Sequence, residues 1–360
     1  MSKVFKQQTH QEVVGIILDY TPKQIQHYPY KPSTFTVPSK LNDVLIKDVL
    51  KKCSCIACLD PSCMHFSQDE LLLTDERLSE FPVDASDSVC PMDAILWERG
   101  MQFPLIDEER CINCGICARR CPIGAIYSNG ANAVIHANED YVEFLPVTHE
   151  TEKRHRETLL NLKEIKHDGS FQTVSERSLG IVYGKLNEQQ TGVQFPNLIV
   201  RNFFLVLGNQ CIIRRHGDVY FRIDSIIADK PVIGVAEVEF HKDTLESPRA
   251  ILDDIAVLSS RYEIEKTQIK PFIISLEFPN TRTEYWRVIK DIKDVLGVRV
   301  HSLTLGALCM LAWSFEPVPI GGVDFYADVD MPSIKDAIEK ACGKGKLPNF
   351  ASIAILEPTK

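Results

Sequence analysis

The sequence predicts an α+β protein with a cysteine-rich N-terminal part and a C-terminal α/β sandwich built around a central mixed sheet. At 360 residues the chain exceeds the size that one hydrophobic core usually supports, so two domains are expected. Eight of the twelve cysteines, between residues 55 and 121, have related spacings. From about residue 194 onward, apolar residues recur instead at helical and strand periods. Their order, helix–strand–strand–strand–helix–strand–helix–strand, is typical of helices packed on a mixed sheet.

The most informative stretch of the N-terminal part is a cysteine run that ends in proline. Cys111, Cys114, Cys117 and Cys121 follow the pattern C-x2-C-x2-C-x3-C, and Pro122 comes next. Two residues between successive cysteines let three thiolates point inward from one loop, while backbone N–H groups donate to inorganic sulfide. Zinc sites more often use two separated C-x2-C pairs. The spacing therefore predicts a 4Fe–4S cluster.

A stretched copy of this run lies upstream. Residues 55–58 read C-I-A-C, as residues 111–114 read C-I-N-C, and Cys63 offers a third thiol. The copy closes at residues 90–95, C-P-M-D-A-I, which parallel residues 121–126, C-P-I-G-A-I. The parallel makes Cys90 the counterpart of Cys121.

With this repeat, residues 51–146 resemble a two-cluster bacterial ferredoxin domain with an insertion at residues 64–89. In that family the fourth cysteine of a run ligates the other cluster. The resemblance assigns the first 4Fe–4S cluster to Cys55, Cys58, Cys63 and Cys121. It assigns the second cluster to Cys90, Cys111, Cys114 and Cys117. The first half departs from the family pattern in its four-residue gap before Cys63, and Cys53 is a rival ligand to Cys55.

The segments on either side of the cysteine-rich domain are less distinctive. Residues 1–50 are rich in Pro and Tyr and receive no role, and residues 147–190 form a charged connector. The second domain is expected over residues 191–360.

The second domain begins with a helix over residues 197–207, which Gly208 ends. Three strands are expected at residues 211–215, 220–228 and 231–240, with a turn at Asp229-Lys230. The remaining expected elements are a helix at 248–262, a strand at 272–276, a helix at 284–296 and a strand at 298–305.

Three carboxylates fall on neighbouring strands of this sheet. Glu237 and Glu239 share one face of their strand, and Asp224 lies on the strand before it. A hairpin turn near residues 229–232 would place Asp224 opposite Ala236 or Glu237. Carboxylates that close raise one another's pKa unless a cation neutralises them, and Mg²⁺ is the natural partner. The alternative is that the glutamates face solvent and that Asp224 lies at a sheet edge.

At these residues the region resembles the PD-(D/E)XK nuclease superfamily, with a restriction endonuclease-like fold. The match consists of Asp224, after Arg222-Ile223, and Glu237-Val-Glu239 thirteen positions later. Ile223 replaces the family's Pro, and Glu239 replaces its Lys. Some restriction enzymes carry Glu at that position as a ligand or base, and Lys242 could reach in from the strand end. The resemblance implies that Asp224 and Glu237 hold Mg²⁺, and that Glu239 positions a water or binds a second metal ion.

Two classes of function follow. The first is an Mg²⁺-dependent endonuclease of the restriction or defence type, which acts on double-stranded DNA as a homodimer. The alternative is a dicluster electron-transfer or redox-sensing protein whose α/β domain binds a partner without catalysis. A glycine-rich dinucleotide fingerprint is absent from the sequence, and Gly321-Gly322 is interpreted as a turn.

Composition favours a reducing compartment. No apolar run approaches the roughly 18 residues that span a bilayer, and the first residues lack the apolar core of a secretory signal. Most cysteines have iron–sulfur spacing rather than the pattern of a disulfide framework. A cytoplasmic protein without membrane attachment is expected.

Overall fold

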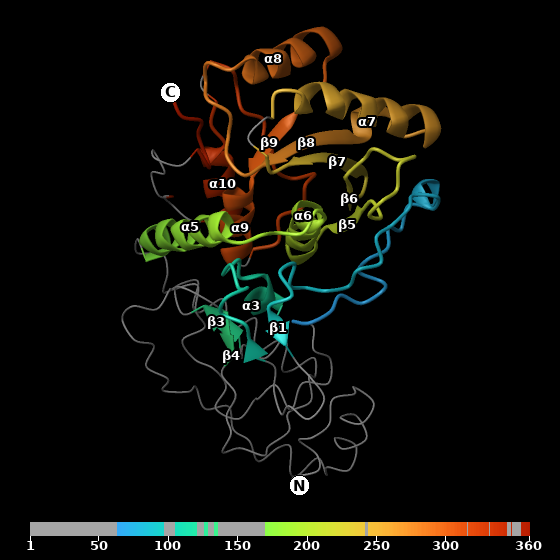
Figure 1. Cartoon of the computed structure of the whole chain (residues 1–360). Helices are drawn as coiled ribbons and strands as arrows, with labels where there is room; N and C mark the ends of the chain where they lie inside the picture. Colours follow the sequence, from blue (N-terminus) through green and yellow to red (C-terminus); the bar gives the residue numbers. More distant parts are fainter. Residues whose placement is uncertain are drawn as a thin grey trace. The chain divides into compact units, whose positions relative to one another are not determined.

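The computed structural model describes residues 63–96, 105–120, 126–128, 133–135, 170–241, 244–314, 316–330, 332–343, 347 and 354–360. The chain divides into two compact units, whose helices and strands are drawn in Figure 1. The first unit comprises residues 1–65 and 88–190, and the second comprises residues 66–87 and 191–360. Most of the segment interpreted as an insertion in the cysteine-rich domain therefore packs with the second unit.

Short elements accompany the cysteine run in the first unit. Two antiparallel pairs are formed by β1 (Ile95–Leu96) with β2 (Leu105–Ile106), and by β3 (Ile126–Ser128) with β4 (Ala133–Ile135). The short helix α3 (Ile116–Arg120) begins within the run. A 19-residue helix, α5 (Ser170–Glu188), occupies the end of the segment expected to be a connector. Its Lys185 Nζ donates to the carbonyl of Glu108 (2.9 Å), so α5 is tied to the chain just before the run.

A five-stranded mixed sheet forms the centre of the second unit. Its strands, in spatial and chain order, are β5 (Gln210–Ile213), β6 (Ser225–Asp229), β7 (Val232–Glu239), β8 (Ile269–Ser275) and β9 (His301–Thr304). The first three strands run antiparallel to one another, and β7, β8 and β9 are parallel. The mixed sheet expected from the sequence is confirmed.

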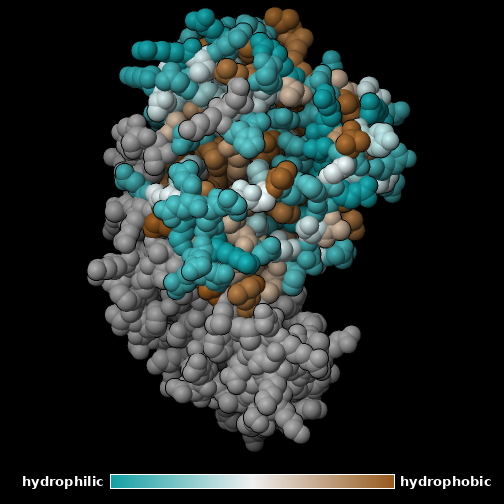
Figure 2. Space-filling view, viewed as in Figure 1, coloured by the Kyte–Doolittle hydropathy of each residue, from teal (hydrophilic) through white to brown (hydrophobic). Residues whose placement is uncertain are grey.

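Helices cover both faces of this sheet. They are α6 (Phe195–Val206), α7 (Ser247–Arg261), α8 (Glu284–Leu296), α9 (Leu305–Trp313) and α10 (Lys335–Cys342). Figure 1 shows α7 and α8 on one side of the sheet and α6 and α9 on the other. The core between these layers contains fully buried side chains such as Phe203, Val235, Phe272 and Leu308. Over the face in Figure 2, apolar residues of this unit lie scattered among polar ones instead of forming one continuous patch.

The strand before the hairpin is shorter than its sequence suggests. Strand character was expected from residue 220, but β6 begins at Ser225. The reason is a side-chain anchor, because Arg214 Nη1 donates to the carbonyls of Asp218 (2.7 Å) and Phe221 (2.9 Å). Oδ1 of Asp218 also accepts from the backbone N–H of Tyr220 (2.9 Å). Residues 218–221 therefore form an ordered loop before the strand starts.

Residues 66–87, here called the strap, run along the edge strand β5. Val83 forms an isolated antiparallel bridge with Arg214. The N–H of Asp84 donates to the carbonyl of Ile213 (2.9 Å), and the N–H of Arg215 donates to the carbonyl of Pro82 (2.7 Å). The strap thus covers backbone groups beside an otherwise open sheet edge.

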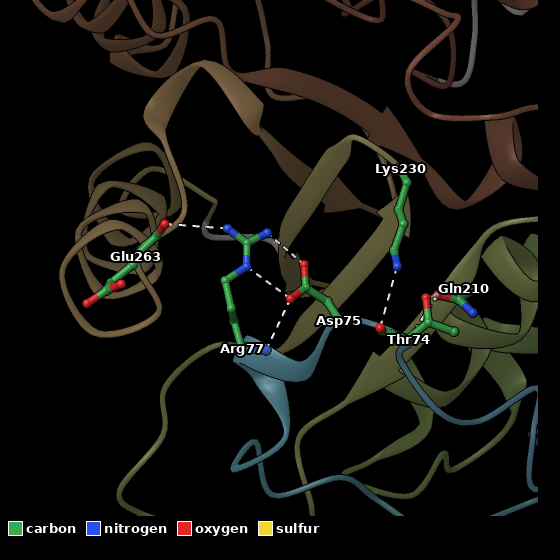
Figure 3. Close-up of polar contacts among 6 residues, drawn as sticks. All are labelled: Thr74, Asp75, Arg77, Gln210, Lys230 and Glu263. Atoms are coloured by element: carbon green, nitrogen blue, oxygen red, sulfur yellow. Dashed lines mark hydrogen bonds and ion pairs between the residues drawn. The ribbon is translucent and has the colours of Figure 1, made fainter.

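Side chains anchor the middle of the strap, as Figure 3 shows. Thr74 Oγ1 donates to Gln210 Oε1 (3.1 Å), and Arg77 Nη1 donates to the carbonyl of Glu263 (3.4 Å). Arg77 also pairs with Asp75 (2.7 Å), which caps the 3₁₀ turn η3 (Glu76–Leu78). The strap is therefore part of the second unit's structure along its whole length.

None of the helices in the described residues combines the length and the apolar character needed to cross a membrane.

Candidate functional site

The cysteine run lies on a loop that turns back on itself before it enters α3. The N–H of Cys111 donates to the carbonyl of Asp107 (2.9 Å), and Asp107 Oδ1 accepts from the N–H of Glu109 (2.9 Å). Asn113 and Gly115 have φ values of 60° and 80°. This left-handed conformation suits Gly, and Asn tolerates it better than most residues. The loop can therefore reverse direction between successive cysteines.

Five cysteine side chains gather at this loop: Cys63, Cys90, Cys111, Cys114 and Cys117. Four of them are buried and Cys90 is partly exposed. Burial raises the pKa of the Cys117 thiol well above its ordinary value, and the other four thiols raise it further. Burial and then the thiols of Cys90 and Cys111 likewise raise the pKa of Cys114. Mutual effects of this kind require sulfur atoms that lie close together.

Cys90 joins this group through the second C-P-x-x-A-I string. Its Sγ accepts from the backbone N–H of Ala94 (3.3 Å). Burial raises the pKa of the Cys90 thiol, while the N–H groups of Ala94 and Met92 lower it. The string leads directly into β1, as its counterpart at residues 121–126 leads into β3. In the order of the chain, each copy of the string is therefore followed by a strand of a short antiparallel pair.

The four residues expected to ligate the second cluster, Cys90, Cys111, Cys114 and Cys117, lie near enough for the charges of the first three to act on the fourth. Among the described residues, however, no three His, Cys, Asp or Glu side chains are placed as the ligands of a metal ion. Cys63, expected in the first cluster, also lies within reach of Cys117. The other predicted ligands of the first cluster, Cys55, Cys58 and Cys121, and the rival Cys53 lie outside the described residues. Buried thiols with nearby backbone N–H donors are the surroundings that an iron–sulfur cluster requires. The residues present thus fit such a group.

A second group of ionisable side chains lies on the sheet of the second unit. Ser225 pairs with Ala236, which places Asp224 level with Glu237 on the neighbouring strand. Asp224 Oδ2 accepts from the N–H of Val238 (3.1 Å). Its Oδ1 lies 3.5 Å from Asn197 Nδ2 and 3.6 Å from Arg214 Nη2. Both oxygens of Asp224 are therefore engaged.

Asp254, from α7, completes this group and was missed by sequence reasoning. Its side chain is only 3% exposed, and α7 packs on β7 and β8. Ile251, Asp254, Ile255 and Leu258 are buried at the spacing of an apolar helix stripe. An acidic residue in such a stripe is the sequence signal that could have identified it. We call Asp224, Glu237, Glu239 and Asp254 the acidic group.

Burial and mutual repulsion hold protons on this group. Burial, followed by the charges of Asp224 and Glu239, raises the pKa of Glu237 to about 7. Burial, followed by the charges of Glu237 and Asp224, raises the pKa of Asp254 to about 8. Burial also raises the pKa of Asp224, although the N–H of Val238 and the guanidinium of Arg214 oppose it.

Glu239 lies further along β7 than the other members and has a local partner. Its Oε1 accepts from the N–H of His241 (3.0 Å), and its charge acts on both Asp224 and Glu237. Lys242, the suggested substitute for the family's lysine, lies outside the described residues. Within the part of the chain that the structure describes, no three His, Cys, Asp or Glu side chains already form a group that could hold a metal ion.

Comparison with known proteins bears on the cysteine run. Residues 104–127 match the family model of the 4Fe-4S binding domain. An uncharacterized ferredoxin of Methanocaldococcus jannaschii is 52% identical over 48 residues, which are 13% of this chain and 29% of that protein. The chain therefore spans less than a third of the relative it matches. Both matches support binding of a 4Fe–4S cluster by this chain, and neither is to a nuclease.

Proposed function

We propose that the chain is a ferredoxin-type iron–sulfur protein that transfers electrons or senses redox state, with the α/β unit as its partner-binding domain. The observation that supports this most directly is the match of residues 104–127, which contain Cys111, Cys114 and Cys117, to a 4Fe-4S binding domain, together with the nearness of Cys90 to these three thiols. These four residues would hold one cluster, which supplies one-electron chemistry when bound. Cys55, Cys58, Cys63 and Cys121 would hold a second.

The protein's own contribution is the environment of the sulfur atoms. Ile112, Ile116 and Ala118 are buried beside the ligating cysteines and limit solvent access. The N–H groups that reach Cys90 oppose the cost of a buried thiolate. Burial, net charge and hydrogen bonds to sulfur are the quantities that set the potential of such a cluster. This loop therefore controls both ligation and redox potential.

The test is the metal content and redox behaviour of anaerobically purified protein. We expect about eight iron atoms and about eight sulfides per chain, because eight cysteines fit two cubanes. Reduction with dithionite should bleach the visible absorption and produce an EPR signal, and a redox titration should give the midpoint potentials. About four irons would refute the second cluster. A protein that holds only zinc would refute the proposal.

A second candidate is an Mg²⁺-dependent endonuclease of the restriction or defence type, acting on double-stranded DNA as a homodimer in the cytoplasm. The observation that favours it is the acidic group, in which Asp224, the residue just before β6, lies level with Glu237 on the adjacent strand β7 of a mixed sheet. In this proposal Asp224 and Glu237 hold the metal ion and Glu239 positions the attacking water or binds a second ion.

Plasmid DNA incubated anaerobically with the protein and Mg²⁺ or Mn²⁺ tests this candidate on a gel. Asp224→Ala should reduce cleavage more than ~100-fold, because the transition state loses a ligand of its stabilising cation. Asp253→Asn removes an acidic charge from the exposed side of α7 and should cleave as the wild type does. A cluster-loaded wild type that leaves the plasmid intact would eliminate the candidate.

A further inference from the structure

The strap begins and ends beside two predicted cluster ligands. Cys63 comes three residues before its first residue, Phe66, and Cys90 comes three residues after its last, Asp87. Both cysteines belong to the first unit, whereas the strap belongs to the second. One short segment is therefore connected at both ends to the cysteine group and packed through its middle on the sheet.

A short ladder closes the strap at its base. We call this ladder, residues 64–66 with residues 87–89, the neck. The N–H of Phe66 donates to the carbonyl of Asp87 (2.7 Å), and residues 65 and 88 form an antiparallel bridge. The chain enters and leaves the neck next to Cys63 and Cys90. The positions of these two cysteines therefore set the spacing of the two segments that make up the neck.

Two side chains add further links between the neck and the cysteine group. Ser88 Oγ donates to the carbonyl of Cys90 (3.0 Å). Arg120, the last residue of α3, donates from Nη2 to the carbonyl of His65 (3.4 Å). The helix that contains Cys117 is thus attached to the same few residues that start the strap.

Beyond the neck, the strap supplies hydrogen-bond partners to the edge of the sheet. The N–H of Arg215 has its acceptor in the strap, the carbonyl of Pro82 (2.7 Å). The N–H of Asp84, within the strap, donates to the carbonyl of Ile213 (2.9 Å). Both N–H groups lose these acceptors when the strap lifts, so their exchange with solvent reports how firmly the edge is covered.

We propose that the strap couples the cysteine group to the β5 edge, so that bound clusters keep this edge covered and their loss loosens the cover. The inference deepens the redox-sensing function proposed above and rests on it, because thiolate–cluster bonds at Cys63 and Cys90 fix both ends of the neck. With its ends held, the strap loses little additional conformational entropy when it lies on the sheet. Without clusters only the neck ladder holds the ends, and local opening becomes more frequent.

Packing limits the size of this opening. Leu71, Leu78 and Phe81 of the strap are buried, and the ring of Phe81 meets that of Phe221 edge-on, with centroids 5.9 Å apart. Arg77 adds the side-chain anchor shown in Figure 3. The middle of the strap therefore stays on the sheet while the neck loosens. Because such coupling is reciprocal, a weaker hold on the middle should in turn weaken retention of the clusters.

Hydrogen exchange of the full chain tests the coupling without any assay of activity. Anaerobically purified, iron-loaded protein is compared with the same protein stripped of iron by a chelator and kept reduced. The N–H groups of Asp84 and Arg215 should exchange at least ~10-fold faster after stripping, while those of β8 should be unchanged. A preparation that never holds iron would refute the proposed function and the coupling with it. Iron-loaded protein in which these two groups exchange no faster after stripping would refute the coupling alone.

A matched pair of substitutions tests the reverse direction. Phe81→Ala weakens the hold of the strap on the sheet and should release iron to a chelator at least ~3-fold faster than the wild type. Phe278→Ala is the control, because both rings are 4% exposed and Phe278 meets Trp286 edge-on (5.6 Å) outside the strap. It should release iron as the wild type does, and circular dichroism checks that both variants fold. Equal release by the two variants would overturn the inference.

Discussion

The cysteine group of the first unit and the acidic group of the second solve the same physical problem in different ways. Both collect side chains whose functional form is negative, and both shield most of them at least partly from solvent, so that burial is the first cause of each raised pKa. The cysteines mostly come from one short run, residues 111–117, whereas the carboxylates come from two strand segments and a helix. One group is therefore assembled by chain spacing, and the other only by the register of the sheet and the packing of α7.

The two groups also differ in how their negative charge is neutralised. Residues 111–118 bury thiols, apolar side chains and Asn113 and contain no cationic side chain, so an inorganic cluster is expected to supply most of the positive charge. The acidic group has partial compensation from the protein, because Arg214 lies 3.6 Å from Asp224. Loss of a ligand should therefore remove the first group's cofactor outright, while changes in the second should be graded.

The largest expected effect is the loss of a cluster from the first unit. Cys117→Ser removes the thiol that the other four cysteines influence most, and iron should fall from about eight to about four atoms per chain. Cys211→Ser is the control, since Cys211 is buried in the second unit and its contact with Ser225 (3.3 Å) suits a hydroxyl equally well. Iron analysis and visible absorption measure both. Equal iron in the two variants would contradict the ligand assignment.

The ferredoxin resemblance implies that the fourth cysteine of each run ligates the cluster of the other half, and a single substitution tests this. Cys121→Ser should damage the cluster assigned to Cys55, Cys58 and Cys63, and should leave that of the 111–117 run largely intact. EPR of the reduced variant distinguishes the two clusters by their separate signals. Loss of the signal from the 111–117 cluster instead would show that the ligands do not cross between the halves.

In the second unit, the largest expected effect belongs to Arg214. Arg214→Ala removes two hydrogen bonds to the 218–221 loop and the counter-charge of Asp224, and should lower the free energy of unfolding by about 2–3 kcal/mol. Arg215→Ala is the neighbouring control. Its side chain is exposed and pairs only loosely with Asp218 (3.5 Å), so its effect should stay within about 0.5 kcal/mol. Urea unfolding can be followed by fluorescence, because Trp286 and Trp313 are buried in this unit.

The contrast between groups set by chain spacing and groups set by tertiary packing also explains which elements could be predicted from the sequence. The helix at residues 284–296 was predicted with the bounds that the structure has, because its apolar face is regular and Gly297 ends it with φ of 69°. The helix α9 was not predicted, because all nine of its residues are buried and it has no polar face to reveal a period. The start of β6 was misplaced because Arg214 and Asp218, not local preference, hold the preceding loop.

Functional side chains, like helices and strands, could be predicted where short-range features of the sequence fix their position. Cys90 could be paired with the 111–117 run because a repeated string marks it, and the structure brings it there. Asp224 and Glu237 could be placed opposite each other because the hairpin register is short-range, and Asp229 pairs with Val232 as expected. Asp254 could not be located, since its neighbours are set by how α7 lies on β7 and β8.

A smaller effect is expected from the pH dependence that Asp254 confers. Its pKa is raised from 3.8 to about 8, so between these values the folded protein holds a proton that the unfolded chain has lost. Stability should therefore fall as pH rises through this window, in buffer without divalent cations. Asp254→Asn should remove this contribution and be more stable than the wild type at pH 9, by about 1–2 kcal/mol. Urea unfolding of the wild type and of Asp254→Asn at pH 5 and pH 9 measures it. An unchanged pH profile in Asp254→Asn would show that the carboxylate is not protonated there.

The smallest expected effect is that of a substitution at Glu239. This member of the acidic group influences Asp224 and Glu237 through its negative charge. Glu239→Gln keeps an oxygen that can accept from the N–H of His241, and removes one charge that raises the pKa of Glu237. The free energy of unfolding at neutral pH should change by less than about 0.5 kcal/mol, as for most substitutions near a surface. Its direction should be stabilising above pH 7, where Glu237 is ionised and the repulsion is fully expressed. Destabilisation by more than 1 kcal/mol, in the urea titration used for Arg214→Ala, would place Glu239 among the structurally engaged carboxylates.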